Sequence, residues 1–459
     1  MNKSDIIKYL DDINEEIKEL SLELWNNPET SENERESANL FRTKLKSYGF
    51  VIEEIEGLEN AFIAEYGSGS PVIAVLGEYD ALPGLSQAVD TKFNPLKPNG
   101  PGHGCGHNLL GGAALGSVLA IKRYIEESGK GGTIRFYGCP EEETLAGKVK
   151  MIKKGAFEGC DLALSWHPMS ANAAIEKAFL ANNSIKFRFH GISAHAAASP
   201  ESGRSALDAV ELMNVGANYL REHIIDRARV HYTITNTGGA PNIIPKEAES
   251  WYYVRAPYRK DVEEITERLF KIAKGAAMMT ETTVDYEIIS GCYEMLPNTV
   301  LFDLTYKNMV EIGTPTYTDE EMVFAKTIQE TIDPKMVENE IRKYMTVEGN
   351  QQLFMHQEII EKEKVNLVEV SGSSDSGDVS WIMPMNLFLT ACWPLGVANH
   401  SWQATSLAGS TIGIKGMDYA AKVFAGIMYD LLNDSNLVED AKKEFSKRTE
   451  KRKYISPLK

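Results

Sequence analysis

The chain has 459 residues, of which 43% are hydrophobic and 25% are charged, a composition typical of a soluble globular protein. Its formal net charge of −17 argues against nucleic-acid binding and against a role at anionic membranes, although local arginines could hold a small anionic substrate. A single core rarely grows to this length, so we expect two domains.

The N-terminal residues contain no apolar core before a small-residue cleavage site, and no window approaches about 20 continuous apolar residues. We therefore expect neither a signal peptide nor a membrane span. The five cysteines are odd in number and scattered, which fits the reduced thiols of a cytoplasmic protein better than a disulfide framework.

The first part of the chain alternates predicted helices and strands. Ser4 is expected to cap an amphipathic helix that runs to about Trp25, and a second helix is expected at about 31–48. The remaining elements before residue 170 are apolar strands near 60–67, 71–79, 131–139 and 160–167 and helices near 107–128 and 150–157. This order predicts an α/β fold with a mixed, mostly parallel sheet.

The pattern changes after residue 180. Residues 181–297 show the order β-α-β-β-α-β, which predicts an inserted ferredoxin-like α+β domain. The first domain would then be discontinuous, comprising 1–180 and 298–459. We expect the charged segment 333–364 to be an exposed helical excursion, and no chemistry is assigned to it.

The stretch "GHGCGHNLLGG", from Gly102, carries the strongest local signal for chemistry. Cys105 and His107 lie two residues apart between glycines, so a thiolate and an imidazole can face one cation. The alternative is a buried cysteine with His103 and His107 near a helix start. No second paired half follows, which favours a catalytic metal site over a structural one.

Acidic residues follow two of the buried strands. "PEEET" supplies Glu141, Glu142 and Glu143, of which one could bind metal and a neighbour could act as general base on a metal-bound water. The alternative is an exposed acidic turn. Asp80 could orient an imidazole ligand from outside the ligand shell, or simply end a strand.

Two more histidines could complete the ligand set. His167 ends an apolar strand, and His400 lies in "GVANHSWQ"; each alone is as readily an ordinary histidine. In the inserted domain, His195 lies in a loop of small residues. Asn242 and Arg255 could together clamp a carboxylate or carbonyl, whereas the alternative for Arg255 is a surface strand residue.

Several motifs together resemble the dinuclear metallopeptidase and aminoacylase family, in its amidohydrolase branch with a cysteine in the metal cluster. The resemblance covers about residues 25–431 and rests on motifs that keep their order: "GEYDALPGLSQ", "GHGCGHNLLG", "FYGCPEEE", "SWHP", "HAAASPESGRSALDAV", "GGAPNIIP" and "DSGDVSW". The segment Thr144–Gly147 departs from the glycine-rich run of that branch.

The resemblance implies a role for each candidate residue. Glu142 would be the general base, and His195 would stabilise the oxyanion and reach the partner subunit of a dimer. Asp80 keeps the orienting role inferred above from its place at a strand end. Asn242 and Arg255, with His195, would bind substrate. The ligands of two divalent ions, manganese or zinc, would be Cys105, His107, Glu143, His167 and His400.

The function implied is metal-dependent hydrolysis of N-acyl or aroyl amino acids of the p-aminobenzoyl-glutamate kind. A dipeptidase or general N-acyl-amino-acid hydrolase would use the same machinery. A non-catalytic metal-binding subunit of a hetero-oligomer is the alternative outside the enzymes. The resemblance implies that 1–180 and 298–459 form the metal-binding catalytic domain and that the inserted domain 181–297 serves as a lid or for dimerisation. It implies a homodimer, or a complex with a related A-type subunit.

Overall fold

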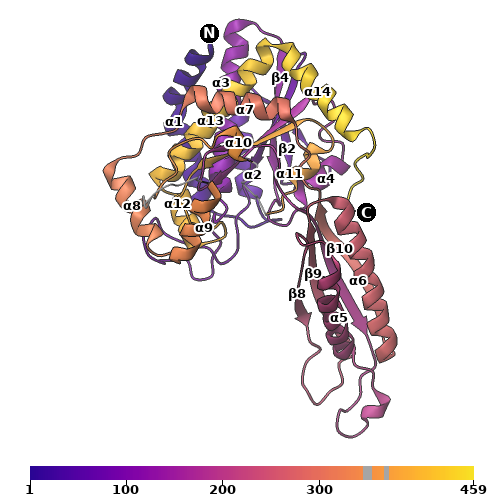
Figure 1. Ribbon diagram of the computed structural model, residues 1–459. Helices are drawn as coiled ribbons and strands as arrows, with labels where there is room; N and C mark the ends of the chain where they lie inside the picture. The colour runs from indigo at the N-terminus through magenta and orange to yellow at the C-terminus, as the bar shows by residue number, and fades with distance from the viewer. Residues whose placement is uncertain (345–353, 366–371, 459) are drawn as a thin grey trace. The chain divides into compact units, whose positions relative to one another are not determined.

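The computed structural model describes residues 1–344, 354–365 and 372–458 (Figure 1). The chain divides into two compact units. Unit 1 contains Met1–Ala178, Leu296–Val370 and Val379–Tyr454, and unit 2 contains Phe179–Met295, Ser371–Asp378 and Ile455–Lys459. Within the described ranges, every helix is too short or too polar to cross a membrane.

Unit 1 is built on a seven-stranded sheet. In spatial order its strands are β1 (Val51–Glu54), β2 (Phe62–Ser68), β4 (Gly132–Cys139), β3 (Val72–Glu78), β5 (Leu162–Met169), β11 (Met385–Ala391) and β6 (Ala173–Ile175). The four strands from β4 to β11 run parallel, and the outer strands pair antiparallel. The predicted α/β class with a mixed, mostly parallel sheet is confirmed.

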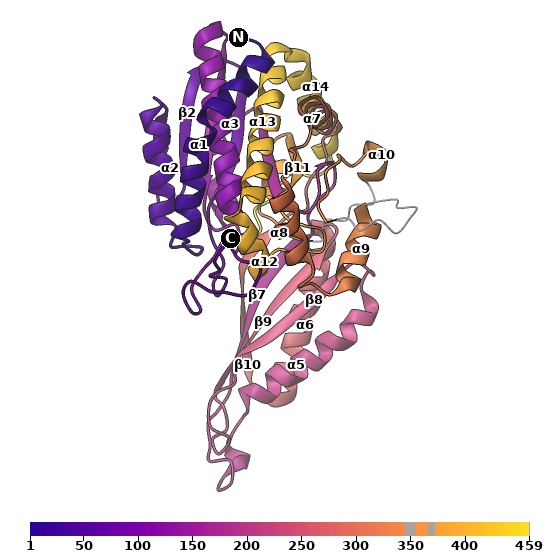
Figure 2. The ribbon, with the colours of Figure 1, turned by 90° about the vertical axis from the view of Figure 1, so that its left-hand side faces the viewer.

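The central strands are apolar throughout because helices cover the sheet. In β3, the residues from Ile73 to Leu76 are fully buried, as expected for a parallel strand covered on both faces. Three long helices, α1 (Lys3–Asn26), α3 (His107–Ser128) and α13 (Thr411–Asn433), lie side by side (Figure 2). The other helices of unit 1 are α2 (Arg35–Ser47), α4 (Gly147–Lys153), α7 (Thr299–Ile312), α8 (Asp319–Gln329), α9 (Pro334–Tyr344), α10 (Lys362–Val365), α12 (Trp402–Ala408) and α14 (Ser435–Thr449).

Helix α3 approaches the sheet closely because it is rich in small residues. A Cβ atom added at Gly111 would lie 2.6 Å from the Phe41 ring and 2.7 Å from the backbone oxygen of Glu78. Only glycine fits there without displacing its neighbours. This contact brings the start of α3 next to the carboxyl end of β3.

Two sequence-based expectations for unit 1 were wrong in detail. The cap of α1 is Asn2 rather than Ser4: its side chain accepts from the Asp5 amide, while the Asp5 side chain accepts from the Asn2 amide, a reciprocal capping box. The second helix begins at Arg35, four residues later than expected.

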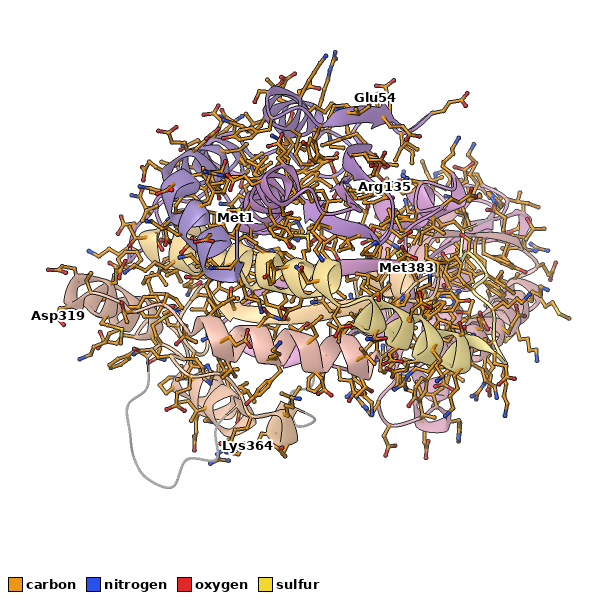
Figure 3. All side chains as sticks on the ribbon, turned by 90° about the horizontal axis from the view of Figure 1, so that it is seen from above. Met1, Glu54, Arg135, Asp319, Lys364 and Met383 are labelled. Atoms are coloured by element: carbon orange, nitrogen blue, oxygen red, sulfur yellow. The ribbon has the colours of Figure 1, made fainter. Side chains whose placement is uncertain are left out.

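The segment 333–364 is not simply an exposed excursion. Figure 3 labels Asp319, the first residue of α8, and Lys364, the last residue of this segment, which lies in α10. Met355 and Ile360 are buried, and the Asn172 side chain donates to the backbone oxygen of His356 at 2.9 Å. Residues 354–360 therefore pack against the sheet domain, whereas 345–353 lie outside the described residues.

Unit 2 has the predicted β-α-β-β-α-β order. Its antiparallel sheet has the order β10 (Thr283–Cys292), β7 (Ala181–His190), β9 (Glu247–Ala256) and β8 (Arg229–Asn236). Helices α5 (Ala206–Leu220) and α6 (Arg259–Thr280) cover one face. Alternate residues of β7 and β9 enter that core, and the residues between them lie on the opposite, more polar face. Short 3₁₀ turns occur at Pro200–Ser202 and Arg221–His223. A short helix, α11 (Ser376–Ser380), begins in unit 2 and ends in unit 1.

Candidate metal centre

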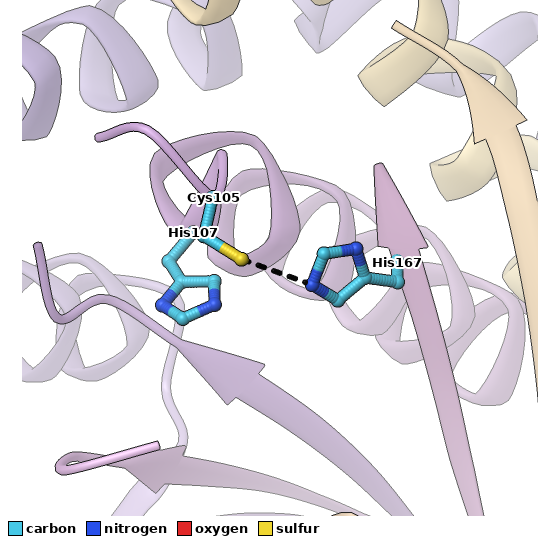
Figure 4. Close-up of side chains that lie close together, drawn as sticks. All are labelled: Cys105, His107 and His167. Atoms are coloured by element: carbon cyan, nitrogen blue, oxygen red, sulfur yellow. Dashed lines mark hydrogen bonds between the residues drawn. The ribbon is translucent and has the colours of Figure 1, made fainter. Parts of the chain in front are cut away.

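The glycine-rich stretch forms the turn that leads into α3. Gly106 is the N-cap of this helix and has a φ of 75°, a left-handed conformation that glycine adopts at little cost. Cys105 and His107 thereby flank the turn and face the end of β5, which carries His167 (Figure 4). The Cys105 Sγ and His167 Nε2 atoms lie 3.4 Å apart.

His107 is fully buried, and its ring orientation is fixed by Asp80. Its Nδ1 lies 2.9 Å from both the backbone oxygen and the Oδ1 atom of Asp80. Both oxygens are acceptors, so Nδ1 carries a proton and Nε2 faces the centre. Asp80 also accepts a bond from the Glu143 amide at 2.9 Å, and so it joins the two loops that carry candidate ligands.

A tight turn after β4 places the acidic residues. Glu141 and Leu145 both adopt a φ of 58°, and the Leu145 amide donates to the Glu142 oxygen at 2.8 Å. The Glu142 Oε2 and Glu143 Oε1 atoms then lie 3.8 and 4.0 Å from His107 Nε2.

Glu141 has a different role from its two neighbours. Its carboxylate is paired with Lys150, and its amide donates to the buried Glu34 carboxyl at 2.8 Å. Glu34 in turn accepts from the Asn60 side chain at 3.0 Å. Glu141 therefore anchors the turn.

His400 reaches the same centre from the C-terminal part of unit 1. Its amide donates to the Gly104 oxygen at 2.9 Å, which ties its loop to the glycine-rich turn. Its Nε2 lies 3.2 Å from Glu143 Oε2, and its side chain is 54% exposed. His400 therefore lies at the rim of the centre.

The converging donor atoms fit a metal centre. Two sets of atoms, each within 4.8 Å of one another, share the Cys105 thiol: one adds His107 and His167, and the other adds Glu143 and His400. Two ligand atoms that are each about 2.1 Å from one ion at a tetrahedral angle lie roughly 3.4 Å apart. The Nε2 of His107 and Oε1 of Glu143 are buried without a hydrogen-bond partner, an arrangement that a shared cation would satisfy.

The protonation preferences of the centre follow from burial and charge. Burial, reinforced by the nearby charge of His107, lowers the pKa of His167 to about 4, so this ring is neutral, the form that binds metal. Burial lowers the pKa of His107, but Cys105 and Asp80 outweigh it and hold that pKa well above its usual value. Burial and Glu143 raise the pKa of the Cys105 thiol. The surroundings of His107 Nε2 thus favour a positive charge.

His103 belongs to the motif but not to the centre. Its buried ring donates through Nε2 to the Leu24 oxygen at 3.2 Å. Burial and the nearby His107 lower its pKa to about 3.

Three residues near the centre were missed by the sequence analysis. Glu78, the last residue of β3, places Oε2 3.5 Å from His107 Nε2, and Lys148 on α4 pairs with its other oxygen at 2.6 Å. Asn399 donates to Cys105 Sγ at 3.6 Å. An acid at a strand end was the signal that singled out Asp80, and it applies equally to Glu78; Lys148 and Asn399 carry no sequence signal of their own.

The candidate substrate residues all lie in unit 2, but at different ends of its sheet. His195 pairs with Ile243, and the Ala196 amide donates to the Asn242 oxygen at 3.0 Å, so His195 and Asn242 share one exposed loop cluster. Arg255 lies near the other end of β9, opposite Asn182. The eight residue steps from Glu247 to Arg255 span roughly 26 Å of strand. One copy of the chain therefore does not bring Asn242 and Arg255 together as a clamp.

Arg255 itself has unsatisfied hydrogen-bonding capacity. Its Nε and both polar side-chain atoms of its cross-strand neighbour Asn182 are buried without a hydrogen-bond partner. Buried donors and acceptors of this kind are usually paired, in many cases by a ligand or water. The Arg255 guanidinium lies over the ring of Tyr253, 5.6 Å from its centroid, a contact that leaves the Nε hydrogen unpaired.

The chain resembles known peptidases and hydrolases over most of its length. The family model described as "Peptidase family M20/M25/M40" matches residues 74–455. The chain is 41% identical to the B-type subunit of p-aminobenzoyl-glutamate hydrolase from Escherichia coli (strain K12), over 99% of this chain and 98% of that protein. It is 28% identical to the Xaa-Arg dipeptidase of Mus musculus, over 97% of this chain and 93% of that protein.

A solved structure shares the fold. The Bacillus subtilis YXEP protein, described as a dinuclear metal binding peptidase from the M20 family, matches with a TM-score of 0.60 at 17% identity. The match covers 92% of this chain and 99% of that chain.

Proposed function

This chain belongs to the peptidase family M20/M25/M40, and from that premise we propose that it hydrolyses the amide bond of aroyl amino acids such as p-aminobenzoyl-glutamate. It is a hydrolase of a metal-dependent family, and its 41% identical relative is named for that substrate. The observation that carries the proposal is the convergence of two ligand sets on Cys105, beside an acid that lies in neither set.

The ligand set proposed for two divalent ions is Cys105, His107, Glu143, His167 and His400. The combination of thiolate, imidazole and carboxylate is compatible with zinc and with manganese. When bound, such ions would polarise the scissile carbonyl and lower the pKa of the attacking water.

Glu142 is the proposed general base. Its Oε2 lies 3.8 Å from His107 Nε2, so it borders the centre, and it is only 7% exposed. Glu142 takes the proton from the attacking water and delivers it to the leaving amine as the amide C–N bond breaks. Asp80 keeps His107 in the tautomer that presents Nε2.

We assign substrate recognition to unit 2. Arg255, with its unpaired Nε, would hold the carboxylate of the amino-acid part. His195 and Asn242 lie at the other end of that sheet, and we propose that they act on the site of a second copy, where His195 would stabilise the oxyanion. The assembly proposed is a homodimer. All five cysteines have free thiols, which supports a reducing, cytoplasmic setting.

The test combines elemental analysis with an assay of p-aminobenzoyl-glutamate hydrolysis. The purified chain should hold two divalent ions and hydrolyse the substrate. Glu142→Gln should keep both ions and lose roughly 10²- to 10⁴-fold in kcat. Glu141→Gln is the matched control, because the Glu141 carboxylate is paired with Lys150 and lies outside the metal-binding sets. Full activity of Glu142→Gln would refute the assignment.

The dipeptidase alternative is favoured by one observation, the 28% identity to the Xaa-Arg dipeptidase over nearly the whole chain. Comparing kcat/KM for p-aminobenzoyl-glutamate with kcat/KM for a panel of dipeptides separates the two. A chain that binds two ions but hydrolyses neither class, even with a related A-type subunit added, would instead be a non-catalytic metal-binding subunit.

A further inference from the structure

One acidic residue at the metal centre has no role in the function proposed above. Glu78 ends β3, is 2% exposed, and directs Oε2 toward His107 Nε2 at 3.5 Å. It is closer to that nitrogen than Glu142 or Glu143, at 3.8 and 4.0 Å. Glu78, His107 and Glu142 also form a third set of donor atoms within 4.8 Å of one another.

A buried lysine holds the other oxygen of Glu78. Lys148 is fully buried in the first turn of α4, and its Nζ lies 2.6 Å from Glu78 Oε1. A lysine is almost never fully buried unless it is paired, because desolvating an ammonium group is costly. The ion pair fixes Oε1 and leaves Oε2 directed at His107, so it orients the carboxylate as well as neutralising it.

The spacing of Glu78 matches that of the other proposed ligands. Its 3.5 Å separation from His107 Nε2 is close to the roughly 3.4 Å expected for two ligands on one tetrahedral ion. The Cys105–His167 and Glu143–His400 pairs have separations of 3.4 and 3.2 Å. Since Nδ1 of His107 is occupied by Asp80, its Nε2 can bind only one ion, and Glu78 is positioned to share that ion.

We propose that Glu78 is a further ligand of the ion held by His107, and that Lys148 is a positioning residue which orients this carboxylate and balances its charge. The proposal rests on the dinuclear metal centre of the proposed function. It makes Lys148 the counter-charge that allows one more carboxylate in a centre already containing a thiol and two glutamates.

Cobalt(II) binding to the chelator-treated full-length chain tests this without an activity assay. Titration calorimetry gives the affinity for each ion, and the visible absorption of bound cobalt reports the coordination of the ion. We expect Glu78→Gln to bind one of two cobalt ions roughly 10- to 100-fold more weakly and to change the visible spectrum. Lys148→Met should weaken the same ion but retain the wild-type band positions, because Glu78 still binds.

Controls with the same chemical changes come from a partly buried lysine pair of unit 1. Lys422 lies 2.7 Å from Asp418 in α13, and both side chains are at most 20% exposed. Asp418→Asn and Lys422→Met make the same chemical changes there, and they should leave cobalt affinity and spectrum unchanged.

Glu78→Gln removes the negative charge of Glu78 from beside the buried Lys148 ammonium group, which can prevent folding. The double variant Glu78→Gln/Lys148→Met removes both charges and then carries the test, with its melting curve as the check on folding. A folded Glu78→Gln or double variant with wild-type cobalt affinity and spectrum overturns the proposal while leaving the proposed function intact. A wild-type chain that binds fewer than two cobalt ions overturns the dinuclear centre itself, and with it both proposals.

Discussion

Most candidate residues of the metal centre in unit 1 are buried, whereas the loop of unit 2 that carries His195 is exposed. In unit 1, Glu78, Asp80, His107 and Lys148 are each at most 2% exposed, and they contact one another. In unit 2, His195 is exposed on a loop.

This difference indicates where each group of residues finds its partners. The unit 1 residues are oriented by their own chain, since Asp80 fixes His107 and Lys148 fixes Glu78. Arg255 keeps a buried nitrogen without a partner, and the His195 loop faces solvent. We infer that unit 1 forms a preorganised centre, whereas the unit 2 residues act only when substrate or a second copy is present.

The largest effect is expected from removing the thiol that the two ligand sets share. Cys105→Ala should lose tightly bound metal and reduce kcat/KM by roughly a thousandfold, or about 4 kcal/mol. Elemental analysis and the hydrolysis assay measure both effects. The Cys160→Ala variant, which alters a thiol hydrogen-bonded to Tyr137, is the control. Retention of both ions in Cys105→Ala would show that unit 1 is not organised around this thiol.

The next test asks whether unit 2 serves a second copy. A mixture of inactive Cys105→Ala and His195→Ala chains, unfolded and refolded together, should recover about a quarter of wild-type activity, because half of the random dimers contain one complete site. Each variant refolded alone should remain inactive. No recovery in the mixture would mean that His195 acts on its own chain or that the dimer does not form.

A smaller loss of metal binding is expected when one ligand, the His107 ring, is no longer held in its orientation. Asp80→Asn replaces an acceptor of His107 Nδ1–H by an amide, so the tautomer that presents Nε2 is less favoured. Metal affinity should fall roughly 10- to 100-fold, as measured by competition with a chromogenic chelator. Unchanged affinity would mean that the preorganisation inferred for unit 1 does not depend on this contact.

The Arg255→Met substitution tests whether unit 2 binds substrate without contributing to metal binding. Loss of a charge-assisted hydrogen bond to a substrate carboxylate should raise KM by about tenfold, without changing metal content. The cross-strand neighbour Arg229 is exposed and bonded to backbone oxygens of its own loop, so Arg229→Met is the control. An equal effect of both substitutions would point to general electrostatics rather than to a specific contact.

The smallest effect concerns the stability of unit 1. Burial and the nearby Asp80 raise the pKa of Glu34 to about 7. The folded state therefore keeps a proton that the unfolded chain has already released, and stability falls as pH rises between about 4.5 and 7. From pH 6 to pH 7 the loss should be about 1 kcal/mol. Urea unfolding of Glu34→Gln should lack this part of the pH dependence; an unchanged profile would contradict it.

Much of the fold followed from local pattern. The apolar strands, the long helices and the β-α-β-β-α-β order of unit 2 each have a short-range periodicity, and the structure contains them. The N-cap residue of α1 was harder to predict from sequence, because Asn2 and Ser4 are both favourable N-cap residues. The choice falls to Asn2 because Asp5 lies three residues later and returns a hydrogen bond.

The candidate site was predictable only where strong ligand types cluster. Cys105 and His107 are recognisable in the sequence as candidate metal ligands. The role proposed for Lys148 follows only from its buried ion pair with Glu78, which is a tertiary contact. In unit 2, the separation of Asn242 from Arg255 depends on the register of β9, which residue types do not reveal. The burial of Met355 likewise could not be predicted from the polar sequence around it, because it depends on tertiary contacts.

The loop that carries His400 follows β11, near the C-terminal end of unit 1, while Cys105 precedes α3. Nearly all of unit 2 is synthesised between these two residues. A nascent chain thus cannot present the whole proposed ligand set until about nine-tenths of its translation is complete. With the proposed ligand set, metal acquisition would be a late step of biogenesis, and a ribosome stalled before residue 400 would display only part of that set.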